Sequence, residues 1–199
     1  MGWFSSWIAT QGGEAGELLE HLGLEETGVE VFPPDGKFSW AQFPNQWIVV
    51  FSQDFDWGNP DRVRELSRIG LTLGCQFEDK VEMTSLLFAA RDGEELWRVF
   101  HNAVGSTYRL DVTGEPPSEL WAIRDRIFQE QDSNGGETAG VDYIHDIPFE
   151  LAKVVCGYRH DEDETPFKEL RRARDAGRDQ GRRKSGLLGR LLGVLTQQS

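Results

Sequence analysis

Residues 71–112, LTLGCQFEDKVEMTSLLFAARDGEELWRVFHNAVGSTYRLDV, decide the fold class of this chain. Apolar and polar residues alternate from Leu71 to Phe77, which is the two-residue period of a half-buried β-strand. Three further strand segments follow, at residues 82–91, 95–101 and 108–112. Asp92-Gly93 supplies the positive-φ positions of a tight hairpin. Short strands joined by tight turns predict an antiparallel meander of four strands.

Both faces of this meander are expected to be covered at least in part, because its second and third strands carry large apolar side chains on both faces. The three best helical segments are at residues 60–69, 118–131 and 148–156. Asn59-Pro60 gives the first an N-cap and a first-turn proline, and Gly157 ends the last. We predict an α+β fold, a single domain over residues 14–160. Its mainly antiparallel sheet has five to seven strands, is packed by amphipathic helices and keeps an aromatic patch on part of one face.

Charge is distributed unevenly along the 199 residues, whose formal net charge is −13. Residues 1–165 hold 12 Lys/Arg and 31 Asp/Glu, a net of −19, whereas residues 166–199 hold nine and three, a net of +6. An acidic body disfavours nucleic-acid binding there, because attraction to phosphates is the main sequence-independent term in such binding. Its charge suits solubility, or docking to a basic protein partner.

Cysteine usage and hydropathy predict a cytoplasmic protein. Cys75 and Cys156 are the only cysteines, each lies in an apolar run, and neither has the spacing of a metal site or redox motif. Reduced, buried thiols are typical of cytosolic proteins. The N-terminus lacks the pattern of a secretory signal, and no segment approaches the roughly 20 apolar residues that span a bilayer. We expect no cofactor and no bound metal.

Catalytic motifs with a local signature are absent from the sequence, including phosphate-binding loops, zinc motifs and the nucleophile elbow. Histidine titrates near neutral pH and is the common general base, so an enzymatic activity would depend on the histidines. If the chain is an enzyme, a small hydrolase, we expect His101 and His145 to act with Asp142 or Asp146. The alternative is a structural role for these side chains.

The terminal segments are candidates for contact with a partner. In the aromatic N-terminal segment, residues 1–13, Trp3, Phe4 and Trp7 fall at a helical spacing that predicts either an anchor or a segment folded back on the core. Residues 161–199 form an acidic run followed by a basic, amphipathic tail that we expect to be mobile when free. Its candidate binding residues are Asp161, Glu162, Asp163, Glu164, Arg182, Arg183, Lys184, Leu188 and Leu191. The tail has three candidate surfaces: a partner protein, an anionic membrane or the acidic body itself.

In general character the chain is small, acidic, rich in tryptophan and without a catalytic motif. In this it resembles the immunity proteins of bacterial toxin systems, and the resemblance carries over no site residue. The sequence predicts a non-catalytic, acidic module that binds another protein, such as an inhibitor, an immunity protein or an adaptor. The alternatives are a small hydrolase that uses the His and Asp residues, and a protein held at a membrane surface by its terminal segments.

Overall fold

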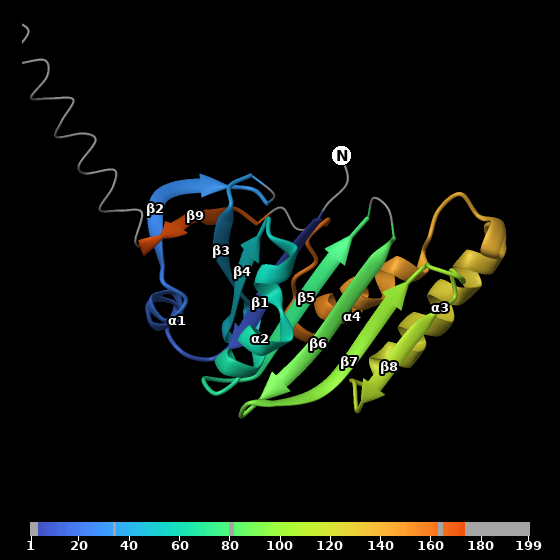
Figure 1. Ribbon diagram of the computed structural model, residues 1–199, viewed down its shortest axis with the longest axis horizontal. Coiled ribbons are helices and arrows are strands. Elements are labelled where there is room, and N and C mark those ends of the chain that lie inside the picture. Colours follow the sequence, from blue (N-terminus) through green and yellow to red (C-terminus); the bar gives the residue numbers. More distant parts are fainter. Residues whose placement is uncertain (1–3, 34, 80–81, 163–164, 174–199) are drawn as a thin grey trace, which may run out of the picture.

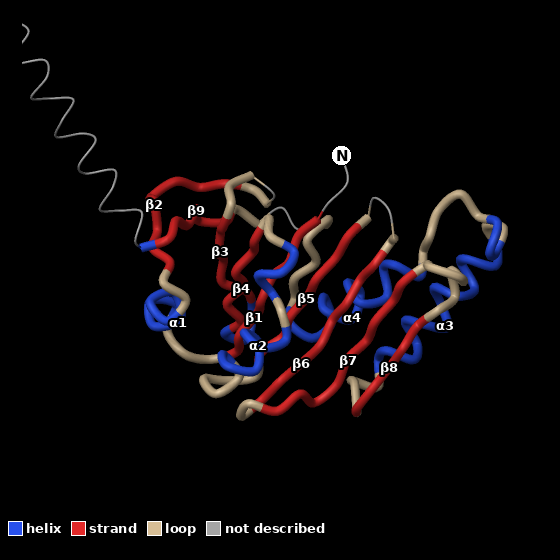
Figure 2. Tube along the Cα trace, viewed as in Figure 1, coloured by secondary structure: helices blue, strands red, loops and turns tan. Residues whose placement is uncertain are grey.

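The computed structural model describes residues 4–33, 35–79, 82–162 and 165–173. Its strands are β1 (Phe4–Gln11), β2 (Leu24–Val31), β3 (Phe38–Phe43), β4 (Trp47–Ser52), β5 (Thr72–Glu78), β6 (Thr84–Arg91), β7 (Glu94–Asn102), β8 (Leu110–Gly114) and β9 (Phe167–Arg172). Its α-helices are α1 (Ala15–His21), α2 (Pro60–Leu66), α3 (Glu119–Ser133) and α4 (Ile147–Cys156). Within these residues the strands form one open antiparallel sheet in the order β2-β9-β3-β4-β1-β5-β6-β7-β8 (Figures 1 and 2).

The predicted meander is present as β5, β6, β7 and β8, paired in sequence order. Asp92 and Gly93 have φ angles of 54° and 87°, the positive values that the hairpin between β6 and β7 requires. The helix ends are also confirmed: the Asn59 side chain accepts a hydrogen bond from the Arg62 backbone N–H at 3.0 Å, and Gly157 has a φ of 78°. The α+β class is therefore confirmed.

The sheet has more strands than the predicted five to seven. The reason is that two segments predicted to lie outside the domain, one near each end of the chain, also form strands of it. Instead of a helical turn, residues 4–11 form β1 in the middle of the sheet, where Trp7 pairs with Phe51 on one side and Cys75 on the other. Residues 167–172 form β9, inserted between β2 and β3. Both pairings join segments far apart in the sequence, so no local turn signal could predict them.

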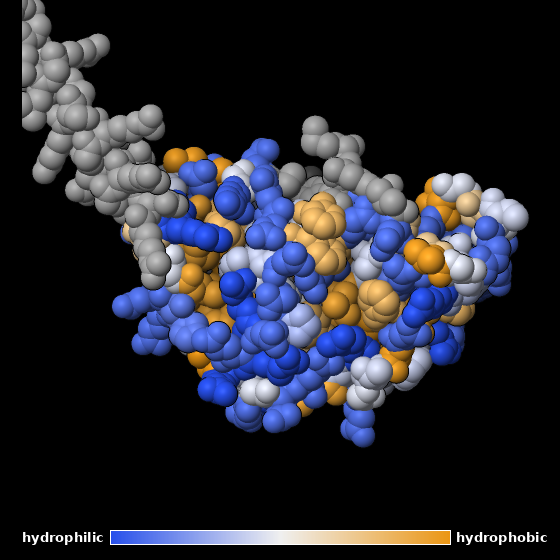
Figure 3. All heavy atoms as spheres, in the orientation of Figure 1, coloured by the Kyte–Doolittle hydropathy of each residue, from blue (hydrophilic) through white to orange (hydrophobic). Residues whose placement is uncertain are grey.

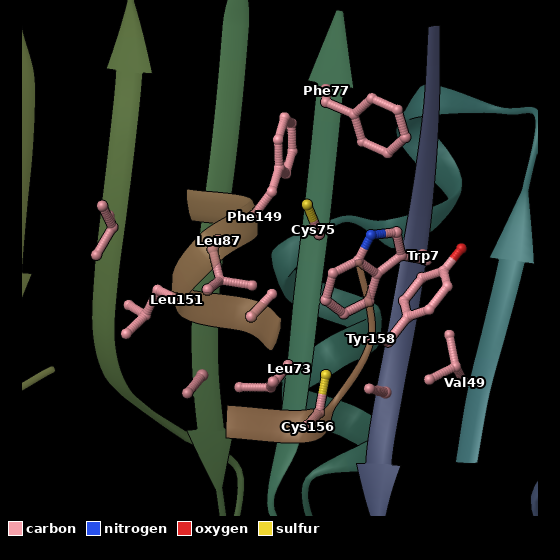
Figure 4. Close-up of a cluster of buried hydrophobic side chains, with 14 of the residues drawn as sticks. Trp7, Val49, Leu73, Cys75, Phe77, Leu87, Phe149, Leu151, Cys156 and Tyr158 are labelled. Carbon is pink, nitrogen blue, oxygen red and sulfur yellow. The ribbon is translucent and has the colours of Figure 1, made fainter. Parts of the chain in front are cut away.

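Helices cover the two faces of the sheet unequally. On one face α3 and α4 enclose the larger core, where Trp7 and Leu87 of the strands lie near Leu151 of α4 (Figure 4). The Tyr158 ring, just beyond α4, meets Trp7 edge to face with ring centroids 5.4 Å apart. On the opposite face α1, α2 and a 3₁₀ turn at Phe55–Gly58 cover a smaller core, whose strand residues come from β2, β9, β3, β4, β1 and β6 (Figure 1).

Candidate functional site

The structure brings together three of the four residues named as candidate acid–base groups. Nε2 of His101, in β7, lies 2.8 Å from Oδ2 of Asp142. The backbone N–H of His145 donates to Oδ1 of the same carboxylate at 3.3 Å, and the two histidine rings are 6.1 Å apart. Asp146 does not join them: its Oδ2 accepts a hydrogen bond from Nη2 of Arg159 at 2.9 Å.

His101 is fully buried, and both of its ring nitrogens have partners. Nδ1 lies 2.8 Å from the backbone carbonyl oxygen of Arg109, and Nε2 faces Asp142. Both partners are hydrogen-bond acceptors, so both bonds form when the ring carries two protons. The imidazole thus links β7 to the start of β8 and to the loop that carries Asp142. This arrangement is typical of a structural histidine, since neither nitrogen is left to act on a substrate.

His145 is also buried. Its Nε2 lies 3.3 Å from the carbonyl oxygen of Thr84, and burial, followed by the neighbouring charge of His101, lowers its pKa. The hydroxyl of Ser85 donates to the backbone carbonyl oxygen of His145 at 2.8 Å. In a nucleophilic pair the hydroxyl would donate to the ring nitrogen instead. Ser85 therefore holds the backbone of this loop.

Arg159, which was not singled out from the sequence, is the centre of an ionic network at the end of α4. Its side chain is only 6% exposed and lies 2.9 Å from Asp146, 2.7 Å from Glu150, 2.7 Å from Asp161 and 3.3 Å from Glu162. Burial alone would lower the pKa of Arg159, but the hydrogen bonds and charges of Asp161 and Asp146 raise it overall. The carboxylates of Asp161 and Glu162, two predicted binding residues, thus form ion pairs with Arg159.

His160, next to Arg159 in the chain, is half-buried between β5 and α4. Its ring lies against Phe77, with centroids 4.0 Å apart, and against Phe149 at 4.5 Å. Burial is the main cause that lowers the pKa of His160 to about 3, against the opposing charge of Asp161. The ring is therefore neutral at physiological pH. The ring thus forms part of the aromatic packing between Phe77 and Phe149.

The remaining candidate binding residues lie in different environments. Phe4 is 55% exposed, and its ring stacks on Phe55 with centroids 4.8 Å apart. Trp7 is 1% exposed in the central strand, so a partner cannot reach it. Outside the described residues lie Trp3, Asp163, Glu164, Arg182, Arg183, Lys184, Leu188 and Leu191.

A second candidate site lies on the face of the sheet opposite α4. Residues paired across neighbouring strands point to the same face. The register therefore places five side chains in one row across β1, β5, β6, β7 and β8: Ser6, Gln76, Leu86, Phe100 and Asp111. Figure 1 shows β7 and β8 without a helix on this side, and Figure 3 shows apolar atoms over the strands within a hydrophilic surface.

We call the half-buried or exposed apolar side chains of this region the open face, which consists of Phe4, Phe55, Leu86 and Phe100. Phe55 is fixed above β5, because Nε2 of Gln76 donates to its carbonyl oxygen at 2.8 Å. Exposed carboxylates border it, those of Asp54, Asp56, Glu82 and Asp111. Two arginines nearby are paired: Arg98 with Glu95 at 2.7 Å, and Arg109 with Asp111 at 3.0 Å.

The comparisons with known proteins leave function to be inferred from this geometry. No protein-family model, curated protein or solved structure matches the chain. Among the described residues, no helix combines the length and apolar character needed to cross a membrane.

Proposed function

We propose that the chain is a non-catalytic protein-binding module that docks a basic partner on the open face. The observation that supports this is the open face itself, in which the half-buried Phe100 lies on β7, a strand without a helix on this side in Figure 1, next to Leu86 of β6. An apolar centre with a polar rim is the usual anatomy of a protein interface. The acidic rim would speed association with a basic partner, and salt would weaken this effect.

The histidine cluster gives less support to a hydrolase. A general base must come within hydrogen-bond reach of the proton that it removes. His101 has no exposed surface, and Asp142 and the Arg109 carbonyl oxygen already bond its two nitrogens. The Ser85 hydroxyl donates to a backbone carbonyl rather than to an imidazole. These groups are better explained as structural hydrogen bonds that connect β6, β7 and the segment leading into α4.

Inhibitors, immunity proteins and adaptors are modules of the proposed kind, and the cytoplasm is the proposed compartment. All three act through a preformed surface rather than through reaction chemistry. A preformed surface lowers the entropic cost of ordering side chains on association. The membrane contact predicted for the tail concerns residues outside those that the structure describes, and it stays a prediction.

The test is capture of cytosolic proteins on the immobilised full chain at low and high salt, followed by mass spectrometry. Phe100→Gln removes the centre of the open face. Trp121→Gln, at a 42% exposed position on α3, is the matched control for loss of an exposed aromatic group. We expect salt-sensitive partners to be retained by the wild-type chain and the control, and lost by the Phe100 variant. Retention of the same proteins by all three chains would contradict the proposal, as would turnover of a small substrate without any such partner.

A further inference from the structure

A cavity of about 600 Å³ shares no lining residue with the histidine cluster or the open face. The end of α1, the start of β2, the end of β9 and the beginning of α2 surround it. These strands form the edge of the sheet opposite β8 (Figure 1). The apolar part of the lining consists of Leu22, Leu24 and Trp57. Its two arginine side chains are those of Arg62 and Arg172.

Each of the two guanidinium groups makes a cation–π contact with an aromatic ring, and the two rings are neighbours. The guanidinium carbon of Arg62 lies 5.1 Å from the ring centroid of Trp57, and that of Arg172 lies 5.7 Å from the ring centroid of Phe38. The two rings are 5.5 Å apart. Nη1 of Arg62 also donates to the carbonyl oxygen of Trp57. Stacking and this hydrogen bond orient the guanidinium groups before any ligand arrives.

Neither guanidinium has a carboxylate within 4.0 Å among the described residues, although the body of the chain is strongly acidic. Their neighbours in the sequence are paired: Arg64 with Asp61 at 2.5 Å, and Arg171 with Glu25 at 2.7 Å. Burial, followed by the charge of Arg172, lowers the pKa of Arg62. Two cations held close together without an anion repel each other, and a bound anion would relieve this repulsion.

Acidic groups lie around the cavity but form no ion pair with either arginine among the described residues. Glu20 belongs to the lining, and the charges of Glu65 and Asp54 act on Arg62 without an ion pair. Glu65 lies 3.5 Å from Nε2 of His21. Both guanidinium groups therefore keep hydrogen-bond donors for a bound anion.

We propose that this cavity binds the phosphate group of a small molecule between Arg62 and Arg172. A guanidinium group offers a planar fork of N–H donors that matches phosphate oxygens, and two such groups balance a phosphate dianion. The cavity has the size of a small-molecule site and is larger than a phosphate ion requires, so an organic body fits beside Leu22 and Leu24. The Ala173 backbone N–H donates to the carbonyl oxygen of Gly23 at 2.9 Å, which fixes the strand end that carries Arg172.

The test is isothermal titration of the full chain with inorganic phosphate and with phenyl phosphate, an organic phosphate monoester. Arg172→Gln is the main variant, because this exposed strand end can lose its charge without opening the core. Arg171→Gln, the adjacent residue, removes the same charge and is the matched control. Arg62→Gln is a second variant, with its melting temperature measured to show that it folds. Loss of a charged hydrogen-bond partner should weaken binding about tenfold or more.

We expect Arg172→Gln and Arg62→Gln to weaken binding, and Arg171→Gln to leave it near the wild-type value. Tighter binding of phenyl phosphate than of inorganic phosphate would assign the site to an organic phosphate, and equal binding would assign it to the free ion. Both results support a phosphate site. Failure of the wild-type chain to bind either compound would overturn the proposal, as would equal weakening by Arg171→Gln, which would indicate unspecific charge attraction.

Discussion

Replacing His160 by phenylalanine should make the stability of this protein less dependent on pH. His160 lies between Phe77 and Phe149, and burial lowers its pKa to about 3. In the unfolded chain the same imidazole has a pKa near 6.5. Because the folded-state pKa is the lower one, protons bind the unfolded chain first as the pH falls, and the folded state loses stability below about pH 6.5. Phenylalanine keeps an aromatic ring between Phe77 and Phe149 and removes the proton site.

The size of the effect follows from these two pKa values. At about pH 5 the unfolded imidazole is almost fully protonated and the folded one is almost fully neutral, which corresponds to about 2 kcal/mol of lost stability. At about pH 7.5 the same term is close to zero. His145, whose pKa burial also lowers, adds a loss of the same sign that both chains share. The difference in slope therefore reports the replacement of His160, together with its interaction with Asp161.

The assay is urea unfolding followed by tryptophan fluorescence at several values between about pH 5 and about pH 7.5. Phe43→Leu, at the other end of the same core, is the control for destabilisation without loss of an imidazole. We expect this control to lose as much free energy of unfolding on acidification as the wild-type chain, and His160→Phe to lose about 2 kcal/mol less. Equal losses in the wild-type chain and in His160→Phe would refute the reasoning.

Three further predictions concern packing, thiol reactivity and the ionic network. Gly74→Ala places a Cβ 2.5 Å from the Phe88 ring and should lower the free energy of unfolding by about 1–3 kcal/mol. Gly16→Ala, in open space on α1, should raise the free energy of unfolding by up to about 1 kcal/mol. Urea titration measures both. Burial raises the pKa of the Cys156 thiol to about 12, so a colorimetric thiol reagent should react with it only after unfolding. Arg159→Met leaves four partly exposed carboxylates without their shared partner and should lower the free energy of unfolding by about 1–3 kcal/mol at neutral pH, with a smaller loss in acid as they take up protons.

Local sequence signals sufficed for the middle of the chain. The meander, its Asp92-Gly93 hairpin and the helices α2, α3 and α4 each carry their own period, cap or turn residue. Such signals depend only on residues close in the sequence, so these elements can be predicted without knowing the rest of the fold. The pairing of His101 with Asp142 was foreseen only as one of several combinations, because the two residues are brought together by the docking of α4 on the sheet.

The sequence by itself determined the α+β class, the acidic body and the elements with strong local periods. Only the tertiary structure decided that residues 4–11 form the central strand and that β9 lies between β2 and β3. In β1 the buried serines and threonine hide the two-residue alternation, since β1 is covered on both faces. The open face and the Arg62–Arg172 pair likewise join segments far apart in the chain. Contacts between such distant segments depend on how all the strands of the sheet pack together, and the sequence of one segment does not specify this.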